Sequence, residues 1–325
     1  MKWSITKSKM FSQCQRKWYY SAIMASPKSK DPLRREAYLL KQLQSLHAWR
    51  GGIVDKVIER FIIPSIRAKH LPSEDQVNDY CAKLMENQIA FGKARMHQRP
   101  SVTKSNGHDA YCAFFDLEYN GGLDEEKLNV AKEEARTALR NLMRADFLKN
   151  IMEKSSCIIA QRQLAFKMDK FTVSCTPDLI VFYYDAPPLI VDWKVHFFAN
   201  ADSWLQLGVY AVALSKAKPH KDFPDKAYCM LEDVARIRML EYQLLKNEQR
   251  EYSISLEDQA DIYDYIFKSC IDIDGVVGEK KYGTLDVSQF QTARSPQLCE
   301  RCQFKRICWK PTPTAQRFLL QEVLS

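Results

Sequence analysis

Two apolar runs separated by a proline pair dominate the hydrophobic pattern of this chain. The first run covers residues 173–182, the second covers residues 189–195, and Pro187 and Pro188 lie between them. Both runs are rich in Val, Ile and Phe, which favour strands, and proline cannot donate a hydrogen bond to a sheet. The pattern therefore predicts two antiparallel strands joined by a turn.

Helical and strand periodicity alternate along the rest of the chain. A mixed sheet flanked by helices is the architecture that this alternation predicts. Further strands are expected over 157–166, 227–231 and 235–240, the last two as outer strands, and helices over 32–63, 74–95, 124–149, 202–210 and 258–275.

Polar side chains interrupt the two apolar runs at a few positions. Side chains alternate across a strand, so Asp192 and Lys194 share one face and Trp193 points to the other. Asp178 can converge with Asp192 if the two strands pair. Two carboxylates, with the Trp193 carbonyl as a third ligand, suit a hard cation such as Mg²⁺ or Mn²⁺. Lys194 could orient a metal-bound water or offset charge on a phosphodiester, so the predicted chemistry is phosphodiester hydrolysis.

A helix is predicted directly after the second strand. Asp202 and Ser203 suit its N-terminus, and an amphipathic pattern follows. Gln206 and Tyr210 are four residues apart and therefore share one face of this helix.

In this order, the motifs resemble those of the PD-(D/E)xK nuclease superfamily. Pro177-Asp178 matches the first half of its signature, Asp192-Trp193-Lys194 matches the second, and the Gln-x-x-x-Tyr of the following helix is similar to the RecB-type branch. The resemblance implies an α/β, restriction-endonuclease-like fold with an inserted helical lobe. It also implies that Gln206 and Tyr210 contact nucleic acid or support the catalytic lysine.

The chain departs from the RecB-type pattern at two places. Asp55 stands four residues after Gly51, where that branch carries a metal-binding His, and Glu59 follows one turn later. Asp55 is either a replacement oxygen ligand or a solvated helix residue. Gln161 and Gln163 occupy the strand on which many relatives carry a glutamate, so the number of metal ions stays open.

Four of the ten cysteines form a second candidate site. Cys299, Cys302 and Cys308 lie close together near the end of the chain, and Cys14 is the candidate for a fourth ligand. Their spacing suits zinc and an iron-sulfur cluster equally. The resemblance to RecB-type members with one Cys before the nuclease core and three after it implies a 4Fe-4S cluster that joins the two ends of the chain.

Composition narrows the range of functions. The chain has 325 residues, 46% of them hydrophobic, and a net charge of +8, which is compatible with a phosphate-rich partner. We find no signal peptide and no apolar run long enough for a membrane span, and expect an intracellular, cytoplasmic protein. The absence of a phosphate-binding Gly-x-x-x-x-Gly-Lys-Ser/Thr loop excludes a helicase, so any unwinding must come from a partner.

These observations predict a metal-dependent DNA nuclease, an exonuclease or end-processing enzyme that acts on single strands or free DNA ends. The alternatives are an endonuclease of restriction or defence type and a non-catalytic DNA-binding subunit of a helicase-nuclease complex. We expect one nuclease domain over residues 1–325. It comprises a helical lobe (32–150), a catalytic sheet core (151–255), and a C-terminal helix and cysteine segment (256–325) that Cys14 joins.

Overall fold

The computed structural model describes residues 1–196, 203–217, 221–224 and 233–309. Two compact units divide the chain. Met1–Ser8 and Gln44–Asp274 form the first unit, and Lys9–Leu43 with the described residues from Gly275 onward form the second. The predicted strand at 227–231 and the predicted helix start at Asp202 lie outside the described residues.

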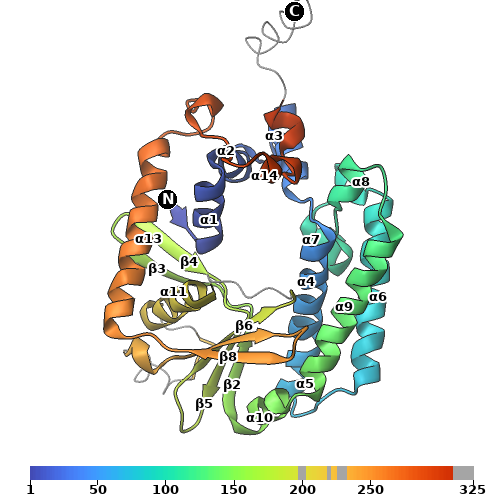
Figure 1. Cartoon of the computed structure of the whole chain (residues 1–325), viewed down its shortest axis with the longest axis vertical. Coiled ribbons are helices and arrows are strands. Elements are labelled where there is room, and N and C mark those ends of the chain that lie inside the picture. The colour runs from blue at the N-terminus through green and yellow to red at the C-terminus, as the bar shows by residue number, and fades with distance from the viewer. Residues whose placement is uncertain (197–202, 218–220, 225–232, 310–325) are drawn as a thin grey trace, which may run out of the picture. The chain divides into compact units, whose positions relative to one another are not determined.

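A five-stranded mixed sheet forms the centre of the first unit (Figure 1). Neighbouring strands pair antiparallel except for β6 and β7, which are parallel. The predicted pairing of the strands on either side of the proline turn is therefore confirmed, as β5 with β6. In spatial order the strands are β2 (Ser155–Ala160), β5 (Leu179–Tyr183), β6 (Leu189–Lys194), β7 (Arg238–Gln243) and β8 (Glu248–Tyr252).

The first predicted strand of that pair is wrong in one respect. Residues 173–182 do not form one strand but break at Pro177, which has no backbone N–H to continue a ladder. The part before the break is β4 (Phe171–Cys175), which belongs to a separate three-stranded sheet with β1 (Lys2–Trp3) and β3 (Leu164–Met168). Asp178 consequently lies in the connection between two sheets.

Two further strand predictions need correction. The segment 157–166 is two strands, β2 and β3, because the chain turns at Gln161, whose φ is +50°. The segment expected as an outer strand at 235–240 becomes β7, which lies between β6 and β8. The hydrophobic pattern identified β7 as a strand, but its place in the sheet depends on the parallel pairing with β6.

Two of the predicted helices are divided. The segment 32–63 is not one helix: α3 (Pro32–Lys41) ends in the second unit, and α4 (Leu46–Val57) begins anew in the first. The backbone of Ser45 is extended, and its side chain caps α4 by accepting from the Ala48 N–H. The segment 124–149 breaks at Ala145, whose backbone is extended. Figure 1 shows α4, α6 and α9 side by side, and these helices pack against one another. The elements are α4 (Leu46–Val57), η2 (Ile58–Ile62), α5 (Ile63–Arg67), α6 (Glu74–Lys93), η3 (Met96–Gln98), α7 (Lys104–Gly107), η4 (His108–Ala110), α8 (Phe115–Tyr119), α9 (Glu125–Arg144) and α10 (Asp146–Lys154).

Small side chains allow α9 to approach α4 closely. Ala135 and Ala138 are fully buried on α9, and Ile53 and Val57 are fully buried on α4. Burial of each branched side chain contributes roughly 1.5–3 kcal/mol. This packing fixes the helix that carries Asp55.

Helix α11 (Ser203–Lys216) packs against both sheets, through β3 and β4 on one side and β6 and β7 on the other. Gly208 allows α13 (Leu256–Val277) to lie close by, because a Cβ at Gly208 would come within 2.5 Å of the Ile262 side chain. A short helix, η6 (Val234–Arg236), precedes β7. The position of α11 brings its Gln206 face to the end of β6.

The second unit joins the N-terminal and C-terminal parts of the chain. The Arg16 Nε donates to the Phe290 carbonyl at 3.1 Å, and the Tyr19 and Phe290 rings lie 4.7 Å apart. Its elements include α2 (Gln15–Tyr19), η1 (Tyr20–Met24), α3 (Pro32–Lys41), η7 (Val287–Gln289), α14 (Pro296–Glu300) and α15 (Lys305–Cys308), and α1 (Ile5–Gln13) begins in the first unit. No helix in the described part of the chain is long and apolar enough to cross a membrane.

Candidate active site

Four elements of the first unit bring the predicted catalytic residues together. The connection between β4 and β5 carries Asp178, strand β6 carries Asp192 and Lys194, helix α11 carries Gln206, and helix α4 carries Asp55. The pairing of β5 with β6 places Leu179 opposite Val191, so Asp178 and Asp192 lie at the same end of the sheet. The convergence that the sequence predicts is therefore present.

Asp178 is held by hydrogen bonds to both of its carboxylate oxygens. The Gln161 side chain donates to Oδ1 at 3.0 Å, and the backbone N–H of Trp193 donates to Oδ2 at 2.9 Å. Burial raises the pKa of Asp178 well above its usual value, and repulsion from Asp192 and Asp55 raises it further. The carboxyl group is thus fixed in place but costly to ionise without a nearby cation.

Asp192 is almost fully buried, with 2% of its surface exposed. Its Oδ2 forms an ion pair with the Lys194 ammonium, and its Oδ1 accepts from the Gln206 Nε2 at 3.0 Å. Trp193 points to the opposite face, where its ring lies 5.8 Å from Phe147. The predicted alternation along β6 is therefore confirmed.

The charge state of Lys194 follows from its neighbours. Burial lowers the pKa of an ammonium, but attraction to Asp192 and Asp178 outweighs burial and leaves the pKa of Lys194 above its usual value. Lys194 therefore stays protonated at neutral pH. It can donate hydrogen bonds and offset negative charge, but it does not act as a base.

Gln206 links the other side chains of the site. Its Nε2 donates to Asp192 and to the Tyr210 hydroxyl at 2.7 Å, and its Oε1 accepts from Lys194 at 3.4 Å. An amide can donate to a carboxylate and accept from an ammonium at the same time, which a carboxylate in its place could not do. Tyr210 is buried, and burial together with Asp192 raises the pKa of its hydroxyl, so this group stays neutral.

Asp55 lies within electrostatic reach of the carboxylates on the sheet. Burial, followed by repulsion from Asp192, raises the pKa of Asp55 to about 7, while Lys194 lowers it and Glu59 raises it. Asp55 is therefore not a freely solvated helix residue. Glu59 is more peripheral, because a third (34%) of its side chain is exposed and it lies 3.7 Å from the Arg60 Nε.

Three carboxyl groups around one ammonium form a donor set that fits a hard divalent cation. Burial, and then repulsion between the carboxylates, raises the pKa values of Asp55 and Asp178. A bound cation would offset both effects. Among the described residues, however, no group of three or more His, Cys, Asp or Glu side chains already has the arrangement of a metal site. The chemistry of the donors fits a cation, and the carbonyl of Trp193 stays a predicted ligand.

Sequence reasoning missed Arg50. This side chain on α4 is 4% exposed, donates to the backbone carbonyl of Val195 and forms an ion pair with Glu134 of α9. It thereby connects the helix that carries Asp55 to the residue that follows Lys194. The signal in the sequence was weak, because an arginine on a helix normally lies on a solvated face.

The structure adds two more polar residues, Glu241 and Gln161, to the site. Glu241 on β7 is fully buried and pairs in register with Asp192, so both lie on the same face of the sheet. Burial would raise its pKa, but hydrogen bonds, including those from Gln243 and Tyr252, lower it. Gln161, which the sequence marked only as a missing glutamate, supports Asp178. The signal for Glu241 was a charged residue inside an apolar strand.

The four predicted iron-sulfur ligands lie in the second unit and line one pocket. Cys14 begins α2, where its sulfur accepts from the Lys17 N–H at 3.4 Å. Burial raises the pKa of the Cys308 thiol, Arg16 lowers it, and repulsion from Cys14 and Cys299 raises it again. Burial also raises the pKa of the Cys302 thiol, and repulsion from Cys14 and Cys308 raises it further. The thiols are thus close enough to interact, although they do not form a preassembled metal site among the described residues.

Comparisons with known proteins complete the description of the site. No curated protein matches the chain. The crystal structure of SSO0001 is 13% identical in sequence to this chain, with a TM-score of 0.25, and the match covers 60% of this chain and 78% of that one. This similarity is too low to indicate a shared function. The model of the PD-(D/E)XK nuclease superfamily matches residues 2–309. This membership implies a metal-dependent nuclease with DNA as its substrate. The chain belongs to the PD-(D/E)XK nuclease superfamily.

Proposed function

We propose that this protein is an exonuclease or end-processing enzyme that hydrolyses DNA at single strands or free ends. The observation that carries the proposal is the meeting of Asp178, Asp192 and Lys194 at one end of the sheet, with Asp55 beside them. These groups supply the negative ligands and the positive donor that metal-assisted phosphodiester hydrolysis needs. The two compact units would act as one nuclease domain.

Mg²⁺ or Mn²⁺ is the proposed cofactor at this end of the sheet. Asp178, Asp192 and Asp55 would hold the ion together with the carbonyl of Trp193. The donors are all oxygen atoms, which both ions prefer. When bound, the ion would polarise a phosphoryl oxygen and lower the pKa of a coordinated water.

The protein side chains have separate roles in the proposed reaction. Lys194, which remains protonated, would donate to the attacking water or to a non-bridging phosphoryl oxygen. Gln206 would hold the Lys194 ammonium and the Asp192 carboxylate at a fixed separation. Tyr210 would orient the Gln206 amide, because its neutral hydroxyl accepts from Nε2.

We further propose a 4Fe-4S cluster held by Cys14, Cys299, Cys302 and Cys308. Support comes from the shared pocket and from the repulsion that these side chains would exert on one another as thiolates, which a bound metal centre would offset. The cluster would add a covalent connection between parts of the second unit that the Arg16 and Tyr19 contacts already bring together. A helicase or another protein partner would supply any DNA unwinding.

The requirement for an end is tested with two forms of the same single strand. We expect the protein with Mn²⁺ to degrade a linear strand and to leave a covalently closed circle of the same sequence intact. Cleavage of the circle would favour the restriction or defence endonuclease instead. Binding of both forms without cleavage of either would favour the non-catalytic subunit.

A further inference from the structure

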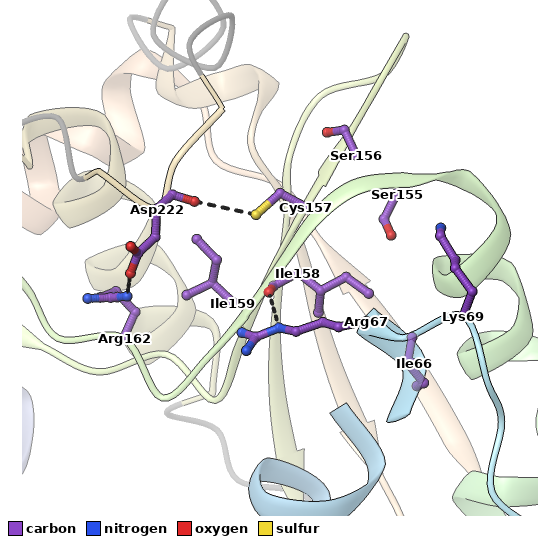
Figure 2. A pocket seen from close by; sticks show the side chains of 10 residues that line it. All are labelled: Ile66, Arg67, Lys69, Ser155, Ser156, Cys157, Ile158, Ile159, Arg162 and Asp222. Atoms are coloured by element: carbon purple, nitrogen blue, oxygen red, sulfur yellow. Dashed lines mark hydrogen bonds and ion pairs between the residues drawn. The ribbon is translucent and has the colours of Figure 1, made fainter. Parts of the chain in front are cut away.

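A pocket of about 330 Å³ lies along the free side of strand β2, which is an edge strand of the five-stranded sheet. Figure 2 shows Arg67 and Lys69 on one side and Arg162 with Asp222 at the other end. The side chains of Ile66, Ile158 and Ile159 contribute apolar surface. The pocket is therefore an elongated site with charged groups at both ends.

Its charge is predominantly positive, with three cationic side chains against one carboxylate. Arg162 and Asp222 form an ion pair, and the Asp222 carbonyl accepts from the Cys157 thiol at 3.4 Å. Among the lining residues that the structure describes, Asp222 is the one acid for the three cations. An anion is the ligand that this balance favours.

Backbone contacts hold Arg67 and Lys69 above the pocket. The Arg67 Nε donates to the Ile158 carbonyl at 2.8 Å, and the Lys69 Nζ donates to the Met152 carbonyl at 2.6 Å. Each contact uses one donor of a guanidinium that has five or of an ammonium that has three. Both side chains are exposed, so their remaining donors can reach a ligand without a large loss of side-chain freedom.

One end of the pocket is one residue along the chain from a residue that supports the candidate active site. Arg162 follows Gln161 directly in the chain, and the Gln161 amide donates to Asp178. From there the pocket runs along β2 toward Ser155, a path of about 17 Å at the usual rise of a strand. Successive phosphates of one strand lie about 3.4 Å apart along the axis of a duplex and farther apart in an extended single strand, so a path of this length can accompany a few phosphates.

We propose that this pocket binds the phosphates of the substrate strand beyond the bond that is cut, and that the strand there is single. This inference rests on the proposed nuclease function. None of the described lining residues is aromatic, so recognition would use the backbone and not the bases, independently of sequence. That the strand is single here follows from the proposed function, which acts on single strands and free ends.

The test measures binding of a labelled single-stranded DNA by fluorescence anisotropy, without divalent metal, over a range of salt concentrations. The variant Arg67→Gln/Lys69→Gln removes two of the proposed phosphate contacts. We expect weaker binding and a salt dependence whose slope, log Kd against log salt, falls by about 1.4, since each contact on a single strand contributes about 0.7. The single variant Lys69→Gln, at an exposed position, should lose about 0.7 and guards against a folding defect.

The matched control is Lys83→Gln/Lys132→Gln, which removes the same charge from the exposed Lys83 of α6 and the half-buried Lys132 of α9, both outside the pocket. An unchanged slope in the pocket variants, or an equal loss in the control, would overturn the proposal. A third result would also overturn it: inorganic phosphate raises the melting temperature of the wild type but not of the pocket variant, and the two proteins show the same salt slope for DNA. The pocket would then bind a small anion and not DNA. A wild type that binds DNA with the expected slopes but cuts nothing would refute the nuclease function alone.

Discussion

The backbone N–H of Trp193 donates a hydrogen bond to Oδ2 of Asp178 at 2.9 Å. This contact joins the break after β4 to strand β6, and it sets the Asp178 carboxylate beside Asp192, the residue before Trp193 in the chain. Pro177, which interrupts the first apolar run, frees Asp178 from the ladder of a continuous strand. The carboxyl groups of Asp178, in the connection before β5, and of Asp192, on β6, can then face one ion.

Replacing Gln206 with alanine should slow cleavage by about 10–100-fold, the usual effect of removing a group that positions metal ligands. The alanine leaves Asp192 and Lys194 without the amide that contacts both. Single-turnover rates on an end-labelled strand measure the loss. Gln163→Ala, at an exposed position, is the control and should cut like the wild type. Equal rates for both variants would show that the bridge has no role in catalysis.

Metal-free protein should lose stability as the pH rises from about 4 to about 7, because the folded pKa of Asp55 is raised to about 7. In this window the folded state binds a proton that the unfolded state has released, so ionisation of Asp55 disfavours folding. Asp55→Asn removes the contribution of Asp55, leaves that of Asp178, whose pKa is also raised, and should melt above the wild type at about pH 8 in a chelator. Asp79→Asn, at an exposed position, is the control.

Added Mn²⁺ should raise the melting temperature of the wild type at the higher pH and raise that of Asp55→Asn less, because a ligand that binds only the folded state stabilises it. Differential scanning fluorimetry measures both effects. If Asp55→Asn and the wild type show the same pH dependence and the same response to Mn²⁺, Asp55 is not part of the cation site.

Arg50→Met should lower the free energy of unfolding by about 3–5 kcal/mol, the usual cost of breaking a buried ion pair from one side. The substitution leaves Glu134 and the Val195 carbonyl without their donor. The double variant Arg50→Met/Glu134→Met should recover part of the loss, since it removes both charges. Urea unfolding provides the measurement. Arg136→Met, which disrupts an exposed pair with Glu133 on α9, should change stability by about 1 kcal/mol or less.

Cys302→Ser should bleach a brown protein and lower its melting temperature, because a 4Fe-4S cluster needs four thiolates. Cys14→Ser should do the same, whereas Cys270→Ser, on α13 in the first unit, should keep the colour. Visible absorbance and metal analysis provide the measurements. A colourless wild type that contains zinc would contradict the iron assignment.

The sequence predicted the parts of the site that depend on local periodicity. Alternation along β6 sends Asp192 and Lys194 to one face, and the helical repeat brings Gln206 and Tyr210 together on α11. Neither conclusion needs knowledge of distant residues. The separation of β4 from β5 at Pro177 was not foreseen, because a short apolar run reads alike whether it is one strand or two.

The hydrophobic pattern of the sequence could not identify residues whose role depends on tertiary contacts. Glu241 lies just beyond the predicted outer strand at 235–240, yet β7 includes it and lies between β6 and β8, where hydrogen bonds from Gln243 and Tyr252 support the carboxylate. Arg50 is buried only because α9 and the end of β6 supply acceptors. In both cases the partner lies on another element, and no spacing in the chain identifies it.

The most direct test of the account compares the wild type with Lys194→Ala on end-labelled single and double strands in Mg²⁺ or Mn²⁺. We predict cleavage by the wild type and a rate for Lys194→Ala that is lower by about 10²–10³-fold, the usual cost of removing one donor to developing charge. Lys132→Ala, which changes a half-buried lysine on α9, should cut normally, and thermal melts should show that all three proteins fold. Equal rates for the wild type and Lys194→Ala would contradict the proposed catalytic site.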